Sequence, residues 1–237
     1  MTVLSIVQDA ADELGIPRPT TVISNTDPSV MQLLALANRS GKSLCHRFPW
    51  QECILEFTHT TLAAESQGTV ESIMPGFNWH LYHTIWNRTL RTIVDGPLFP
   101  PEWQFLKASS VTGPYSEFRI RGKTLRMIPS PTAGQTMAGE YVSRYWCETS
   151  GGTDQEEWVA DTDVGILPED LLTIDLVWRW KRAKGLDYAE EKMEAEIVIN
   201  NAMARNGSNR VMNLEGMSIH DDYPTGIFVP SGTWSLT

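Results

Sequence analysis

Nucleotide binding is the first chemistry to consider, because Ser40–Gly41–Lys42–Ser43 matches the end of a phosphate-binding loop. A complete loop needs a glycine five residues before Gly41, where this chain has Leu36, and it must follow a strand. Here the segment falls inside a helical pattern instead. We therefore expect no nucleotide site at this position.

Metal binding is the second candidate chemistry. Residues 161–165 (Asp-Thr-Asp-Val-Gly) are similar to a calcium loop, but the position that should supply a bidentate glutamate is Leu172. His80 and His83 have no cysteine or acid at ligand spacing, whereas a metal site needs three or four ligands. No nucleophile-elbow pattern is present either. We expect no metal, no cofactor and no catalytic residue, and hence a protein without enzyme activity.

Composition excludes further classes. The net charge of −10 argues against a general nucleic-acid binder, although DNA could slide past an acidic wall without sticking to it. The odd set of Cys45, Cys53 and Cys147 favours a reducing compartment without a disulfide framework. The N-terminus does not resemble a signal peptide, and no apolar run approaches the length of a membrane span, so no membrane partner is expected.

The strongest helical signal, around which the other elements must be arranged, covers residues 167–185. Pro168 favours a helix start, and basic residues followed by Gly185 favour a helix end. One face carries Leu171, Ile174 and Trp178, and a nearly opposite face carries Leu172, Leu176 and Trp180. A helix that is apolar on both sides is covered on both sides. We therefore predict that this helix is internal, with Leu171, Ile174, Trp178 and Trp180 as structural core.

Three more helices are predicted around it. Residues 3–14 and 28–47 each carry a one-sided apolar stripe, and Asp27 and Pro28 favour the start of the second. A helix at 188–205 follows the central one after a short connection, so the two should form an antiparallel hairpin. Its predicted apolar stripe is formed by Ala189, Met193 and Ile197, widened by Ile199, Ala202 and Met203.

Residues 51–164 are predicted to form a small antiparallel sheet or barrel, because apolar residues there begin to recur at every second position, as in a strand. Arg121–Gly122–Lys123 is typical of a tight hairpin turn, and residues 102–107 predict a single helical turn. The strand candidates start near Cys53 and include residues 84–94, 116–121, 124–128 and 136–146.

The last stretch, residues 207–237, holds isolated apolar residues between glycines and prolines. Such a segment cannot bury itself, so we expect an extended arm that becomes ordered on a partner surface. The sequence thus predicts an α+β fold. Residues 1–50 and 165–206 would form an antiparallel helical bundle, residues 51–164 a β-rich insertion, and residues 207–237 an extended C-terminal arm.

Tryptophan is the one residue type in excess, with nine in the chain. Most tryptophans in small sheets lie in cores or interfaces. A sugar-stacking platform is the alternative, and it would make the chain a carbohydrate- or receptor-binding module. Its members would be Trp79, Trp86, Trp103, Trp146 and Trp158.

Several stretches of the chain resemble one protein family. They are Asn87–Arg88–Thr89, Gly96–Pro97–Leu98, Pro101–Glu102–Trp103, Phe118–Arg119–Ile120–Arg121–Gly122, residues 129–134, Glu140–Tyr141–Val142–Ser143, and residues 167–188. Together they resemble the head-to-tail adaptor proteins of tailed bacteriophages and prophages, the group that includes tail tubular protein A of short-tailed phages. The resemblance extends over roughly residues 1–205.

The resemblance implies a structural virion protein of the head–tail junction, assembled in the host cytoplasm. Such proteins form homo-oligomeric rings, often of twelve subunits, with the phage portal protein on one face and a tail or nozzle protein on the other. DNA passes through the central channel without sequence-specific binding. Trp79, Trp86 and Trp103 become candidates for contacts with neighbouring subunits or the tail. The portal contact is predicted to lie in the arm, at Tyr223, Ile227, Phe228, Val229 and Trp234.

Overall fold

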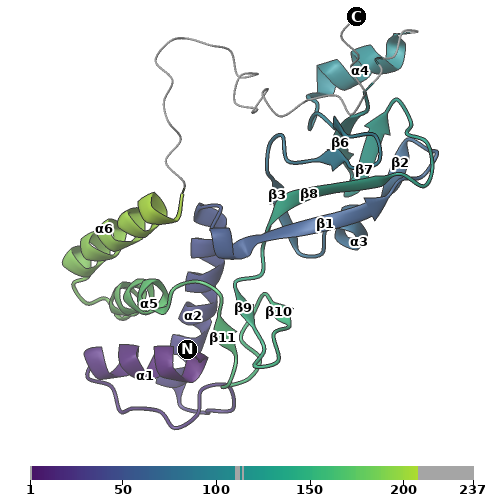
Figure 1. Ribbon diagram of the computed structural model, residues 1–237. Helices are drawn as coiled ribbons and strands as arrows, with labels where there is room; N and C mark the ends of the chain where they lie inside the picture. Colours follow the sequence, from purple (N-terminus) through teal and green to yellow (C-terminus); the bar gives the residue numbers. More distant parts are fainter. Residues whose placement is uncertain (1, 110–112, 114, 208–237) are drawn as a thin grey trace, which may run out of the picture. The chain divides into compact units, whose positions relative to one another are not determined.

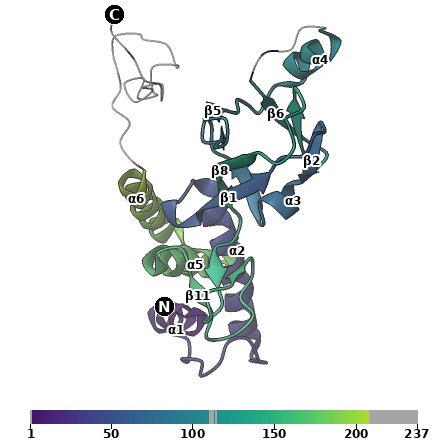
Figure 2. The ribbon, with the colours of Figure 1, turned by 45° about the vertical axis from the view of Figure 1, so that its right-hand side comes forward.

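The computed structural model describes residues 2–109, 113 and 115–207. Its helical part is built around α5 (Glu169–Lys184), which lies between α1 (Val3–Glu13) and α6 (Ala189–Asn206) (Figures 1 and 2). The helix α5 also contacts α2 (Pro28–Arg47). Leu171, Trp178 and Trp180 are buried, and Ile174 is half-buried against the same core. The central helix is therefore covered on both sides, as its pattern predicts.

Local signals explain where these helices begin and end. The Asp27 carboxylate accepts a hydrogen bond of 2.7 Å from the amide of Ser29, which caps α2. The helix α5 begins at Glu169, with Pro168 in the capping position. It ends at Gly185, whose φ of 72° is the left-handed conformation that glycine adopts at little cost.

The largest sheet is organised around β8 (Thr136–Ser143). One edge of β8 pairs with β1 (Ile54–Thr60) over the whole length of β1, in antiparallel register. The other edge pairs with β3 (Phe77–His80) and with β4 (Trp86–Asn87), which in turn pairs with β5 (Thr92–Ile93). A 3₁₀ turn, Gln51–Cys53, leads from the helical part into β1.

Two smaller sheets are also antiparallel. One has the order β2 (Ser66–Thr69), β7 (Thr124–Ile128), β6 (Glu117–Arg121), and the predicted hairpin turn joins its last two strands. Both Gly122 and Lys123 have positive φ there, as this turn type requires. The other joins β9 (Cys147–Glu148) to β10 (Asp154–Gln155) and β11 (Val164–Gly165). Two further helices are α3 (Val70–Ile73) and α4 (Pro100–Ala108). The fold is α+β.

The described residues form two hydrophobic cores. The core of the β part includes Phe57, Phe118, Leu125, Met127 and Tyr141. The helical core also takes in residues from the end of the segment 51–164. In particular, Trp146 and Trp158 meet edge to face there, with ring centroids 4.8 Å apart. Soon after β8, the chain therefore packs on the helical core again, through Trp146 and Trp158.

Three predictions about single elements are wrong. Residues 84–94 do not form one strand, because the chain reverses between β4 and β5, where Arg91 adopts a φ of 57°. The predicted turn at 102–107 is the nine-residue helix α4, which starts earlier because Pro100 suits its first turn. The predicted stripe on α6 is wrong in part: Met193 and Ile197 are exposed, whereas Ile199, which widens that stripe, is buried together with Ala195 on the opposite side.

The proposed portal-contact residues Tyr223, Ile227, Phe228, Val229 and Trp234 lie outside the described residues. Of the C-terminal segment that the sequence predicts to be an arm, the structure describes only Gly207. Among the helices that the structure describes, none combines the length and apolar character needed to cross a membrane.

Candidate assembly surfaces

The polar centre of the helical core is Asp175 on α5, of which only 3% is exposed. Its carboxylate accepts three hydrogen bonds: from the Ser40 hydroxyl at 2.5 Å, from the Trp178 indole at 2.8 Å and from the Arg179 guanidinium at 2.6 Å. A buried carboxylate is tolerated only when it is paired in this way. The network joins α2 to α5 and fixes the orientation of Trp178, which gives it a structural role.

The basic residues at the end of α5 interact with groups of the same chain. The guanidinium groups of Arg179 and Arg182 lie 4.8 and 5.6 Å from the Trp178 ring, and the Lys184 amine lies 4.3 Å from the Trp180 ring. Lys181 forms an ion pair with Glu191 on α6. The Lys181 pair joins α5 to α6, and the other contacts lie within α5, so each of the four basic side chains has a partner in the same chain.

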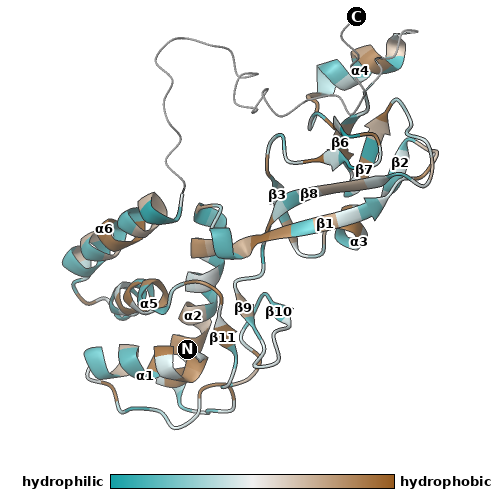
Figure 3. Cartoon of the chain, in the orientation of Figure 1, coloured by the Kyte–Doolittle hydropathy of each residue, from teal (hydrophilic) through white to brown (hydrophobic). Residues whose placement is uncertain are grey.

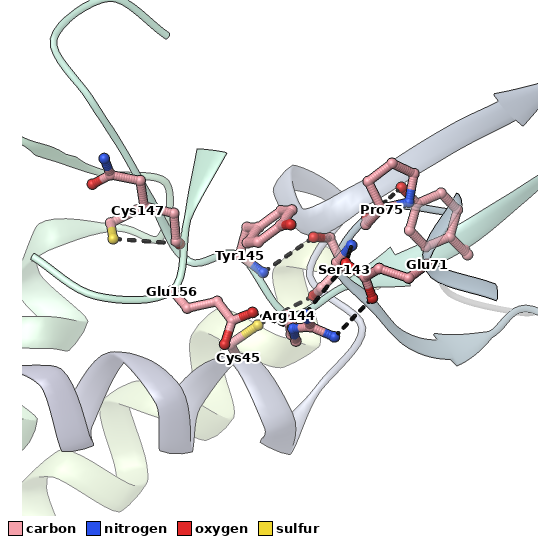
Figure 4. Close-up of polar contacts among 11 residues, drawn as sticks. Cys45, Glu71, Pro75, Ser143, Arg144, Tyr145, Cys147 and Glu156 are labelled. Atoms are coloured by element: carbon pink, nitrogen blue, oxygen red, sulfur yellow. Dashed lines mark hydrogen bonds and ion pairs between the residues drawn. The ribbon is translucent and has the colours of Figure 1, made fainter. Parts of the chain in front are cut away.

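Figure 4 shows how the chain passes from β8 into β9. The Arg144 guanidinium is hydrogen-bonded to both Glu71 and Glu156, and its bond to Glu156 is the main reason that its pKa is raised. The Cys45 thiol donates to the Ser143 carbonyl oxygen at 3.3 Å. The thiol bond joins the end of β8 to α2, and the Arg144 bonds join the segment after β8 to α3 and to the loop at Glu156.

The side chains considered for metal binding are not arranged as a metal site. Burial lowers the pKa of His80, while His83 has its Nδ1 3.6 Å from a carboxylate oxygen of Asp95. In the described ranges 2–109, 113 and 115–207, no group of three or more His, Cys, Asp and Glu side chains could hold a metal ion. All three cysteines are buried, and burial raises the pKa of Cys147 to about 12.

The tryptophans predicted to contact partners are covered to different degrees. Trp103 is only 1% exposed, so it offers no surface for the predicted contact with a neighbouring subunit or the tail. It is the one buried residue of α4, and it anchors that helix. Trp79 is half-buried against the helical core, and Trp86 is half-buried in β4. The structure therefore does not bring these three residues together as one surface.

The structure instead reveals an apolar surface around α4, which we call the α4 surface. Phe99 and Phe105 are 69% and 71% exposed. Beside them, a shallow hollow is lined by Leu98, Pro101, Phe105 and Leu106, with the acidic residues Glu102 and Glu117 at its edge. Large apolar side chains exposed together are typical of sites that bind a partner.

The acidic edge of the α4 surface is electrostatically unfavourable in the free chain. Partial burial is the main cause of the raised pKa of Glu117, and the charges of Asp95 and Glu102 raise it further. The Glu102 carboxylate also accepts a hydrogen bond of 2.9 Å from the Phe99 amide, which holds the start of α4 in place. A cation placed in this hollow would relieve the repulsion among the carboxylates.

The glutamate at position 117 should make stability depend on pH. Because the pKa of Glu117 is raised in the folded state, folding favours the protonated carboxyl group. The ionised carboxylate lowers stability by its full amount above the folded-state pKa. This loss shrinks as pH falls below the folded-state pKa and is gone below the unfolded-state pKa. Glu117→Gln is therefore expected to raise the melting temperature by about 1–2 °C at pH 7. Thermal unfolding followed by circular dichroism should show no difference at pH 3. A variant that is less stable than the original at pH 7 would contradict this assignment.

A second apolar surface lies on α6, which we call the outer face of α6. Met193 and Ile197 are 64% and 55% exposed, one turn apart, on the side opposite the buried Ala195 and Ile199. Figure 3 shows hydrophobic and hydrophilic residues together along this helix. A helix that only covered the core would be polar on its outer side.

No protein-family model matches this chain, and no curated protein matches its sequence.

The sequence pattern does not predict the α4 surface, although it contains part of the signal. The aromatic pair Phe99 and Phe105 flanks Pro100–Pro101, and a helix start at these prolines would place both rings near one helix. Which of the aromatic side chains is buried depends on the sheet beneath, and the sequence pattern does not reveal it. The apolar period predicts the outer face of α6 as a stripe but places that stripe in the core.

Proposed function

We propose that this protein is a head-to-tail adaptor, a structural virion protein that assembles into a ring, docks on the portal and links it to the tail. The observation that carries the proposal is the presence of two apolar surfaces on different parts of the chain. The α4 surface belongs to the β part, and the outer face of α6 belongs to the helical part. A chain with two such surfaces is suited to joining separate partners.

The supporting features agree with the resemblance noted in the sequence. The central helix α5 is covered on both sides, and a β part is inserted between α2 and α5. We propose that the helical part makes the ring, and that the α4 surface receives the tail or nozzle protein. The net charge of −10 would let DNA pass through a channel with little non-specific binding.

The carbohydrate-binding alternative loses its main support. Trp103, Trp146 and Trp158 are buried, and Trp79 and Trp86 are half-buried, so these five residues present no open stacking platform. We therefore retain the adaptor as the one proposed function.

Mass measurement under native conditions tests this proposal, on the full chain alone and with the portal protein of the same phage. We expect a large closed assembly, formed either alone or on the portal, that appears as a ring with a central hole by electron microscopy. A chain that ends at Gly207 should lose portal docking, since the proposed portal contact lies beyond it. A full-length chain that stays monomeric and does not bind the portal would overturn the proposal.

A further inference from the structure

The outer face of α6 combines exposed apolar and acidic residues. At about 100° per residue, Met193, Ile197 and Ala204 fall on one side of the helix, and Glu190 and Glu194 flank them. All five are exposed. Neither glutamate forms an ion pair with the described residues, whereas Glu191 and Glu196, on other sides of α6, are paired with Lys181 and Arg47.

The outer face of α2 has the complementary composition. The residues opposite its buried side are Met31, Ala35, Arg39, Lys42 and His46, and all five are exposed. Met31 is 56% exposed. Neither Arg39 nor Lys42 forms an ion pair within the part of the chain that the structure describes. The outer face of α2 is therefore apolar in the first half of the helix and basic in the other half.

The two outer faces belong to helices that both pack on α5 with their inner sides. Each outer face therefore points away from the core, and neither is covered within the described chain. The helices have similar lengths, 20 residues for α2 and 18 for α6, or about 30 and 27 Å. They could pack side by side along most of their length.

We propose that the outer face of α6 in one copy of the chain binds the outer face of α2 in the next copy. Antiparallel packing would place Arg39 and Lys42 near Glu194 and Glu190, and Met31 near Ala204. A contact between two α6 faces would instead bring together the Glu190 and Glu194 carboxylates of both copies, with only Arg205 of the last turn as a basic residue on that side. A contact between two α2 faces would bring together basic residues. The charges therefore favour the unlike pair of faces.

This contact is heterologous, because different surfaces meet on the two copies. Such contacts propagate in one direction and form a closed ring when the rotation per copy closes. The inference rests on the proposed adaptor function for its biological role, since it supplies the subunit contact that a ring needs. The contact between α6 and α2 itself involves only copies of this chain, so it can be measured without the portal or the tail.

Two variants, each with one face disabled, test the proposal. Ile197→Glu disrupts the α6 face, and Arg39→Glu combined with Lys42→Glu reverses the charge of the α2 face. Each is expected to weaken self-association at least about 30-fold and to be monomeric by native mass spectrometry. A mixture of the two should give a dimer and nothing larger, because only one competent pair of faces remains. Leu90→Glu, a change of similar size at an exposed position in the β part, should leave assembly unchanged.

The outcomes separate this inference from the proposed function. If both variants assemble like the original chain and still bind the portal, the adaptor function stands and this interface is wrong. If the original chain neither self-associates nor binds the portal, both are wrong. A mixture that stays monomeric also overturns the interface, provided that circular dichroism shows both variants to be folded.

Cross-linking tests the same contact when association is weak. The double variant Lys42→Cys, Glu190→Cys, treated with diamide as the oxidant, is expected to form a ladder of disulfide-linked multimers at high protein concentration. Each new bond oxidises one thiol from each of two copies and reduces one diamide. The matched control Lys42→Cys, Gln104→Cys should remain monomeric on the same gel. Equal ladders for both variants, or none for either, would overturn the proposal.

Discussion

Replacing Trp178 with alanine is expected to lower the free energy of unfolding by about 3–5 kcal/mol. The side chain is only 7% exposed and lies in the helical core. Its loss would leave a cavity and would remove the indole N–H that donates to the buried Asp175 carboxylate at 2.8 Å. It would also remove the ring over which Arg179 lies. Urea unfolding followed by circular dichroism measures the change.

Two controls separate the contributions at this position. Trp178→Phe keeps much of the apolar volume but lacks the N–H, so it should cost less than the alanine variant. Lys184→Ala removes an exposed cation from the Trp180 ring and should cost less than about 1 kcal/mol. A loss below 1 kcal/mol for Trp178→Ala would contradict the placement of this residue in the core.

Gly41→Ala is expected to destabilise the protein by about 1–3 kcal/mol, although alanine is the better helix former by about 1 kcal/mol. A Cβ atom on Gly41 would lie 2.2 Å from a ring carbon of Trp146, closer than atoms can approach. Trp146 is 1% exposed and packs edge to face on Trp158, so its ring has little room to move. Thermal and urea unfolding should both show the loss.

Ser43→Ala is the matched control, because Ser43 lies on the exposed side of the same helix. It should leave stability unchanged or raise it slightly. If the close contact is the cause, shortening the opposing side chain by Trp146→Leu should make the Gly41→Ala change less harmful than it is in the original chain. Stabilisation by Gly41→Ala alone would show that α2 and Trp146 are not packed closely.

The helices were predictable where short-range chemistry determines their ends. Asp27 with Pro28 marks the start of α2, and Gly185 marks the end of α5. The two apolar faces of α5 also correctly predicted a covered helix. These features depend on residues within a turn or two of one another, so the sequence contains them.

The errors come from features that depend on distant parts of the chain. The reversal between β4 and β5 places Arg91 at positive φ without a glycine to signal it. Both sides of α6 are apolar, so periodicity could not determine which side faces α5. The burial of Trp103 likewise depends on tertiary packing rather than on its neighbours in sequence. The candidate surfaces were therefore visible only once the fold was known.

The pairing of β1 with β8 has a further consequence. The β part is entered at Ile54 and left at Val142, and these two residues face each other in register. A segment whose two ends lie side by side can be exchanged for another without moving the scaffold that carries it. The helical part could thus keep its architecture through evolution while residues 55–141 are replaced by a different module. Recombination at the paired positions Ile54 and Val142 would let one helical scaffold carry many different inserted modules.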